Sequence, residues 1–133
     1  MTRVVFLTEY RREPARLLML LRRSAAADRE AFTRLYHALA PDVHATVHAV
    51  LDGDRAREVA AAAFLEAWHS AEQHTAPGTD VAGWIIGIAA RRAEEQGDPR
   101  LGAHPSHDAH SHGDTLAGLL QRRSMRRSPF RRG

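Results

Sequence analysis

The sequence contains no cysteine, which excludes disulfides, thiolate zinc sites and cysteine nucleophiles. It contains no lysine either, so every basic side chain apart from histidine is an arginine. Long membrane-type segments are also missing: the leucine-rich run from Leu17 to Leu21 lies between Arg16 and Arg22, far short of the roughly 20 apolar residues that a membrane span requires. With no targeting signal in view, these absences predict a cytoplasmic protein that does not associate with membranes.

The sequence motifs of catalysis are absent as well. No arrangement of nucleophile and base, no glycine-rich phosphate loop and no structured metal motif occurs in the 133 residues. We therefore expect a protein that is not an enzyme and that needs no cofactor.

Charge is divided unevenly along the chain. Residues 1–23 and 97–133 are rich in arginine, whereas residues 24–96 hold eleven acidic residues against six arginines. A domain that grips DNA by neutralising phosphates usually shows the opposite balance. The C-terminal segment RRSMRRSPFRRG has six arginines in twelve residues. It suits nucleic acid or an acidic protein surface, and it equally suits a solubilising disordered end.

The apolar pattern predicts an all-α fold, because apolar residues recur at every third or fourth position through most of residues 14–97. Pro14 suits the first turn of one helix, and Asp28 is a good N-cap for a second. Pro41 is expected to end that second helix and to open a third, which runs to Leu51.

The stretch from Asp54 to Gln96 carries the two strongest amphipathic helices. Asp54 is expected to cap the first, and Thr79 or Asp80 the second, with a Pro-Gly turn between them. The predicted buried stripes are Val59, Phe64, Ala67, Trp68 and Ala71 on the first helix, and Val81, Trp84, Ile85, Ile88, Ala89 and the stem of Arg92 on the second. Five helical segments with short connections predict a small helical bundle over residues 14–97.

The two ends of the chain differ from this bundle in composition. We expect residues 1–13 to form a mobile N-terminal arm and residues 98–133 a disordered, low-complexity tail rich in histidine and arginine. Within the tail, a short helix capped by Asp114 would be stable only if it docks through Leu116, Leu119 and Leu120.

Four histidines of the tail are weak candidate metal ligands: His104, His107, His110 and His112. Imidazoles at this spacing bind zinc, nickel or copper adventitiously in a flexible chain. A dedicated site would need a fold that orients the rings, so we expect no dedicated metal site.

Several sequence blocks occur in an order that resembles a known family. They lie between about Leu17 and Gln96 and comprise leucines followed by Arg22-Arg23, then Asp28 with Ala31-Phe32, Leu35-Tyr36, Ala40-Pro41 with Val43, AREV-x4-FLEAW and GWIIGIAARRAEE. The ordered set resembles region two of extracytoplasmic-function (ECF) sigma factors, members of the sigma-70 family that direct bacterial RNA polymerase to promoters. The resemblance implies a helical domain that binds the clamp helices of the polymerase largest subunit and reads the promoter −10 element as partly single-stranded DNA.

The resemblance also implies roles for particular residues. Glu58 and Glu66 become candidate polymerase-binding residues. Trp84, Arg91 and Arg92, together with the loop from about Gln73 to Asp80, become candidate DNA-binding elements. The residues by themselves leave other interpretations open: a solvated acidic face for the glutamates, a core aromatic for the tryptophan, and intrahelical ion pairs with Glu95 for the arginines.

Two functional hypotheses follow. The first is a sigma-like transcription initiation protein that binds core RNA polymerase, has promoter −10 DNA as a further partner, and lacks the family's −35-reading domain, because residues 97–133 are too short to supply it. The second is a degenerate sigma-like helical module that binds an anti-sigma factor or another protein without promoter recognition. The second hypothesis rests on the acidic domain and on the missing −35-reading domain. Two departures from the family pattern also bear on function: Ala61-Ala62 stand where the family usually has a Gln-Glu pair, and Glu94-Glu95 lie where DNA phosphates would approach.

Overall fold

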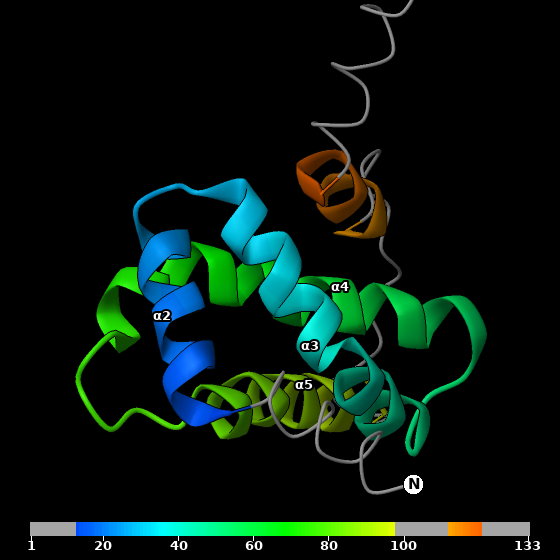
Figure 1. Ribbon diagram of the computed structural model, residues 1–133. Coiled ribbons are helices and arrows are strands. Elements are labelled where there is room, and N and C mark those ends of the chain that lie inside the picture. Colours follow the sequence, from blue (N-terminus) through cyan, green and yellow to red (C-terminus); the bar gives the residue numbers. More distant parts are fainter. Residues whose placement is uncertain (1–12, 98–111, 121–133) are drawn as a thin grey trace, which may run out of the picture.

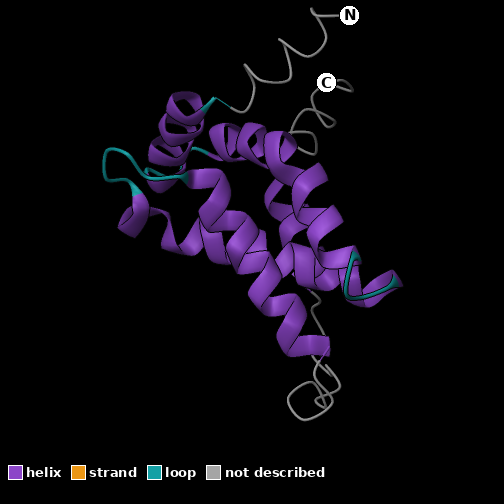
Figure 2. Cartoon of the chain, turned by 90° about the horizontal axis from the view of Figure 1, so that it is seen from below, coloured by secondary structure: helices purple, strands orange, loops and turns teal. Residues whose placement is uncertain are grey.

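The computed structural model describes residues 13–97 and 112–120. In chain order the elements are α2 Pro14–Ala25, α3 Arg29–His48, α4 Gly53–Ser70, the 3-10 helix η1 Ala71–His74 and α5 Val81–Gly97, and residues 112–120 form a further helix. The described residues contain no strand (Figure 2), so the prediction of an all-α fold is confirmed. None of the helices in these two ranges is long and apolar enough to cross a membrane.

The four long helices enclose one hydrophobic core. Helix α3 contacts α2, α4 and α5, while α4 also lies against α5 and η1 (Figure 1). Phe32 and Phe64 are the largest fully buried side chains and come from α3 and α4. The other large side chains with almost no exposed surface are Leu17, Leu20, Leu21, Leu35, Leu39, Val43, Val47, Val81 and Ile85. The apolar positions spaced three and four apart in the sequence therefore face one another, as amphipathic helices require.

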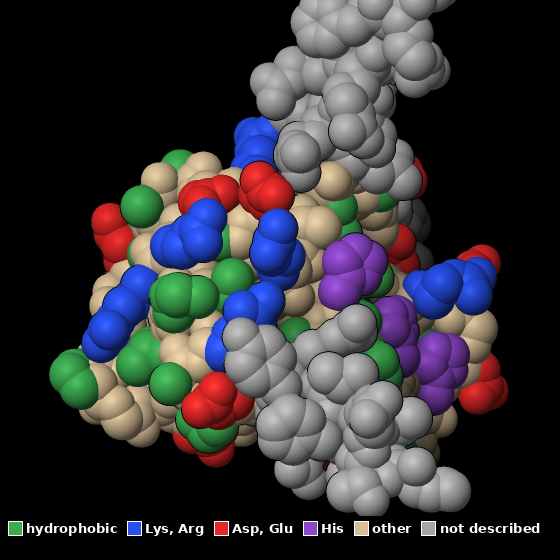
Figure 3. All heavy atoms as spheres, viewed as in Figure 1, with side chains coloured by type: hydrophobic (Ala, Val, Ile, Leu, Met, Phe, Trp, Pro, Cys, Tyr) green, Lys and Arg blue, Asp and Glu red, His purple; other side chains and the backbone are tan. Residues whose placement is uncertain are grey.

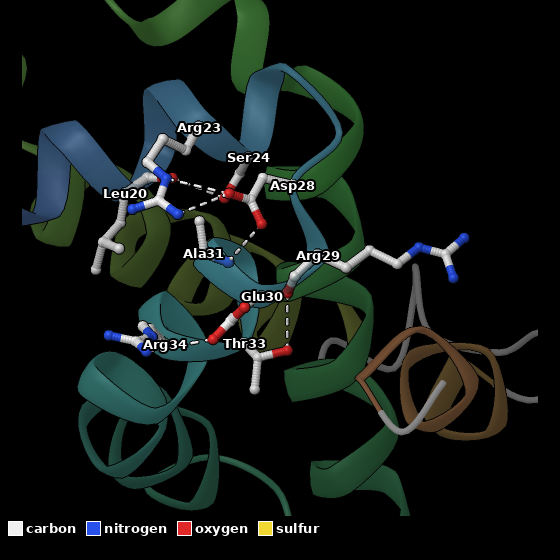
Figure 4. Close-up of polar contacts among 9 residues, drawn as sticks. All are labelled: Leu20, Arg23, Ser24, Asp28, Arg29, Glu30, Ala31, Thr33 and Arg34. Carbon is white, nitrogen blue, oxygen red and sulfur yellow. Dashed lines mark hydrogen bonds and ion pairs between the residues drawn. The ribbon is translucent and has the colours of Figure 1, made fainter. Parts of the chain in front are cut away.

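The connection between α2 and α3 is a tight corner with its own polar network (Figure 4). The amides of Ala27 and Asp28 donate to the carbonyls of Ser24 and Arg23, which closes the end of α2. Ala27 has a left-handed φ of 69°, a conformation that glycine usually supplies. Asp28 then caps α3 by accepting from the Ala31 amide at 3.1 Å, as the sequence predicted. This hydrogen bond and the neighbouring Arg23 guanidinium lower the pKa of the Asp28 carboxyl.

One helix boundary differs from the prediction. The sequence placed a break at Pro41, but α3 runs through Pro41 without interruption and ends at His48. Proline removes one backbone donor, a cost that tertiary packing can outweigh. The buried residues Leu35, Leu39, Val43 and Val47 continue in steps of four across the proline, all with 0% exposed surface. The core therefore holds one long helix where local sequence favoured two.

Helix α4 is buried over more of its circumference than the predicted stripe. Its buried residues include Ala60, Ala61, Ala62 and Ala63, which the sequence had not placed in the core. Small side chains allow the neighbouring backbones to approach closely, so the alanine run serves packing as well as helix propensity. The predicted cap was wrong here: α4 begins at Gly53, and Asp54 makes an ion pair with Arg57 within the first turn.

The C-terminal segment is not uniformly irregular. Residues 112–120 form a helix, and Leu116 is 6% exposed against the core while Leu119 and Leu120 are partly buried. The short helix that was expected to be stable only on docking through these leucines is present, and its described part begins at His112, two residues before the expected cap Asp114. The expected arm and the remainder of the expected tail lie outside the described residues.

Candidate interaction surfaces

The predicted polymerase-binding residue Glu66 and the predicted DNA-binding residues Arg91 and Arg92 form one ion-pair cluster. The Glu66 carboxylate accepts from Arg91 Nη2 at 3.1 Å and from Arg92 Nε at 2.9 Å, which joins α4 to α5. All three side chains retain contact with solvent, with 49% and 37% of the arginine side chains and 30% of the Glu66 side chain exposed. In place of intrahelical pairs with Glu95, both arginines pair across the helix interface. Glu66, predicted to bind polymerase, and the two arginines, predicted to bind DNA, thus neutralise each other's charge within the protein.

Trp84, the third predicted DNA-binding residue, is half-buried and stacked. The imidazole of His74 covers its ring, with centroids 3.9 Å apart and planes inclined by 18°. The His74 ring is held in turn by a contact of 3.1 Å between Nδ1 and the carbonyl of Ser70. A base could stack on this side of Trp84 only after the imidazole moves away. Trp68, by comparison, packs edge-on to Phe32 in the core.

The loop predicted to read DNA, from about Gln73 to Asp80, makes hydrogen bonds near both of its ends. Arg22 of α2 donates from Nε and Nη2 to the carbonyl of Thr75, at 3.1 Å and 3.0 Å. At the other end Asp80 accepts from the amide of Gly83 at 3.0 Å, so it caps α5 as predicted. Between these points Gly78 has a φ of +85°, which only glycine adopts readily.

Glu58 is engaged by the C-terminal helix. Its two carboxylate oxygens accept from the amides of His112 at 2.7 Å and Gly113 at 3.1 Å, and the His112 ring lies 3.6 Å away. The first amides of a helix have no partner within the helix and carry the positive end of its dipole. A carboxylate from α4 therefore caps a helix more than fifty residues away in sequence.

Helix 112–120 lies over a groove between α3 and α4, which we call the α3–α4 groove. Its walls are Thr33, Tyr36, His37 and His44 of α3 and Arg57, Ala60, Ala61 and Phe64 of α4. A cavity of ≈ 420 Å³ remains in it, bordered by Gly113, Leu116, Ala117 and Leu120 of the covering helix. Tyr36 and Phe64 meet edge to face at 4.8 Å.

Histidines gather along one side of this groove. Figure 3 shows a row of histidine side chains over α3, the helix that carries His37, His44 and His48. Burial, together with the neighbouring His48, lowers the pKa of His44. The groove wall is therefore largely uncharged at this position near neutral pH.

Of the four candidate metal ligands, only His112 lies among the described residues. His104, His107 and His110 lie outside the described residues, and His112 is occupied by its contacts with Glu58. Residues 13–97 and 112–120 contain no group of three histidine, aspartate or glutamate side chains placed to hold a metal ion.

Sequence reasoning missed the α3–α4 groove. It assigned Phe64 to the core, and gave Tyr36 no site role. The spacing of Leu116, Leu119 and Leu120 indicated a helix in need of a docking partner, but no sequence pattern indicates which surface receives it.

Together these surfaces define a class: an all-α domain in which the charged side chains predicted to bind partners meet other groups of the protein at contacts between helices. Known proteins offer no significant match to this chain, whether as a family model, a curated protein or a solved structure. The likeness to ECF sigma region two thus remains a prediction from ordered sequence blocks.

Proposed function

We propose that this chain is a sigma-like transcription initiation protein that binds core RNA polymerase through α4 and approaches promoter −10 DNA with α5 and the preceding loop. The observation that carries the proposal is the ordered set of sequence blocks from Leu17 to Gln96. The helices that bear these blocks are long, and they pack around a single core.

Charge on α4 supports the polymerase part of the proposal. Glu58 and Glu66 lie about two helical turns apart and keep 37% and 30% of their side chains exposed. Glu66 is engaged by partly exposed ion pairs, a kind of contact that contributes little stability. Glu58 accepts from the first amides of helix 112–120, so a partner reaches it only when that helix is released. A partner with basic side chains at the same spacing can therefore exchange these contacts for its own.

The DNA part of the proposal requires two local rearrangements. Arg91 and Arg92 must leave Glu66, and His74 must leave the face of Trp84. Surface ion pairs of this kind are worth about 0 to 1 kcal/mol, while stacking of a base on an aromatic side chain contributes about 1 to 3 kcal/mol. These magnitudes allow the exchange without unfolding of the bundle.

Retention of the tagged full chain on purified core RNA polymerase tests the proposal. We expect retention, and we expect Glu66→Arg to reduce it while Glu72→Arg, the same charge reversal on exposed Glu72, leaves it unchanged. Failure of the unaltered chain to bind, under conditions that retain an intact ECF sigma factor, would overturn the polymerase assignment.

A second candidate function is a protein-interaction module without promoter recognition, with an anti-sigma factor as one such partner. The pairing of Arg91 and Arg92 with Glu66 favours it, because the charges that would meet DNA are already neutralised. Promoter-specific initiation by this chain with core polymerase would exclude this candidate. Polymerase binding without such initiation, or binding to a purified anti-sigma factor alone, would favour it over the first.

A further inference from the structure

The α3–α4 groove has the shape and chemistry of a helix-binding site, and helix 112–120 already lies in it. One end of the groove presents the Glu58 carboxylate, which meets the helix N-terminus. The remainder has an apolar strip, formed by Ala60, Ala61 and Phe64 of α4 and Tyr36 of α3. Polar side chains border this strip, namely Thr33, His37, His44 and Arg57. These two parts recognise two properties common to amphipathic helices: free first-turn amides and an apolar face.

Helix 112–120 is held by the groove and has little stability of its own. Its described residues, 112–120, are fewer than the roughly 12 that an isolated helix needs in water, so this part gains its stability by docking. Its structure therefore depends on burial of Leu116 and on the hydrogen bonds to Glu58. A contact of this kind opens more readily than the core helices, whose faces are buried against several neighbours.

The fit between helix and groove is incomplete. The cavity of ≈ 420 Å³ borders Ala117 and Leu120 of the helix and Tyr36, Ala61 and Phe64 of the groove. The cavity is partly open to solvent, so an apolar side chain of a ligand can enter it. A helix with a larger apolar side chain in place of Ala117 would fill more of this space, so the groove can accommodate a better ligand than the one it holds.

We propose that the α3–α4 groove binds an amphipathic helix of a protein partner, and that helix 112–120 is an intramolecular occupant which this partner must displace. The partner helix places its first-turn amides at Glu58 and directs leucine-sized or larger side chains, spaced three and four residues apart, at Tyr36 and Phe64. This inference does not depend on the identity of the partner. Where the proposed polymerase binding through Glu58 also holds, release of helix 112–120 precedes it.

The test uses the full chain and a synthetic peptide. The peptide has the sequence of residues 110–122 with leucine at position 117, and binding is followed by the amide NMR shifts of Ala60, Ala61 and Phe64. In the unaltered chain helix 112–120 competes with the peptide. Leu116→Asp removes the competitor, because a carboxylate cannot remain in the apolar groove. We expect the peptide to bind at least about tenfold more tightly to this variant. In the unaltered chain helix 112–120 covers the groove in most molecules, and in the variant the groove is already uncovered.

A matched variant distinguishes release of helix 112–120 from the effect of an added negative charge on that helix. Gly118→Asp places the same carboxylate on the same helix at an exposed position, where an added Cβ meets nothing within 4 Å. This variant should bind the peptide as the unaltered chain does. In the Leu116→Asp background, Glu58→Gln should weaken the peptide several-fold, because the carboxylate that meets the peptide amides is gone.

Three results would overturn the proposal. One is equal peptide affinity for the Leu116→Asp variant and the unaltered chain, with the core amide shifts of Leu21 and Ile85 preserved. Another is peptide binding that leaves the amides of Ala60, Ala61 and Phe64 unmoved. The third is a concentration-dependent dimer of the unaltered chain, seen by sedimentation, that exchanges helix 112–120 between copies. Should Leu116→Asp unfold the core, Gly113→Pro serves in its place. It removes an amide that Glu58 accepts from, disfavours the helical backbone of His112 and adds no charge, so it should also raise peptide affinity.

Discussion

Glu66 of α4 accepts a hydrogen bond from Arg92 of α5 at 2.9 Å, so a residue predicted to bind protein neutralises one predicted to bind DNA. Arg91 shares the same carboxylate. The cluster ties α4 to α5 at the solvent boundary of their contact and masks two positive charges. Its strength decides whether α5 can offer those charges to a nucleic acid.

Glu66→Gln should release both arginines at little cost to the fold. Exposed ion pairs contribute about 0 to 1 kcal/mol, so the free energy of unfolding should fall by no more than about 1 kcal/mol. Affinity for a single-stranded DNA oligonucleotide should rise and should depend more steeply on salt, because two more cations can meet phosphates. Fluorescence anisotropy across a salt series measures both effects. Glu72→Gln, which removes one charge at an exposed site, should change neither.

His74→Ala should uncover one face of Trp84. The imidazole stacks on the indole at 3.9 Å, and its removal admits water and quencher to the ring. In a Trp68→Phe background, where Trp84 is the remaining tryptophan, we expect a red-shifted emission and a larger acrylamide quenching constant. His69→Ala alters an exposed histidine of α4 and serves as the control. Unchanged quenching in the His74 variant would show that the stack does not persist in solution.

Two glycines of α5 should respond differently to alanine. Gly87→Ala meets nothing within 4 Å and should stabilise the protein by about 1 kcal/mol, the usual difference in helix propensity. At Gly83 an added Cβ would lie 2.9 Å from Cγ of Asp80 and would push away the side chain that caps the helix. Loss of a cap costs about 1 kcal/mol, so Gly83→Ala should gain nothing.

A double variant checks that explanation by chemical denaturation. With Asp80→Ala in place the collision is gone, and Gly83→Ala should then stabilise as Gly87→Ala does. A stabilising Gly83→Ala in the unaltered background would contradict the steric argument.

Stability should fall as pH decreases from neutral, in part through His44. Its folded pKa lies below the usual value of 6.5, so the unfolded chain binds the proton more readily. The contribution is complete above pH 6.5 and is lost as pH falls through the folded pKa. Burial of the ring is the main cause, and the neighbouring His48 of the same helix further disfavours a positive charge on His44.

His44→Gln should therefore flatten the dependence of unfolding free energy on pH below 6.5, as measured by urea titration. Asp28 does not interfere, because its pKa lies below 3.8 and its contribution is lost only at lower pH. A slope that survives in the His44 variant would assign the effect to other histidines.

Much of the fold could be predicted from local sequence. The all-α class, the cap at Asp28 and the cap at Asp80 follow from helical periodicity and from side chains that satisfy helix ends. The break expected at Pro41 was wrong, because local preference does not record the buried side chains on both sides that keep α3 continuous.

The candidate surfaces could be predicted only in part. The sequence named Glu58, Glu66, Trp84, Arg91 and Arg92, and placed each on a helix. It left open a core position for Trp84 and ion pairs with Glu95 for the two arginines. It did not predict the partners that the structure shows, which are His112 and Gly113 for Glu58, Glu66 for the arginines and His74 for Trp84. Contacts between residues tens of positions apart have no local signature, because they depend on how the helices cross.

The sequence by itself determined that this chain forms amphipathic helices, since periodicity and caps act within a few residues of each other. Tertiary structure alone decided which side chains of α4 are buried, which are paired and which border the groove. Packing of α3 and α5 around it buried its alanines, paired Glu66 with the arginines of α5 and left Glu58 at the end of a groove that helix 112–120 covers. Which charges remain available to a partner is therefore a property of the folded arrangement.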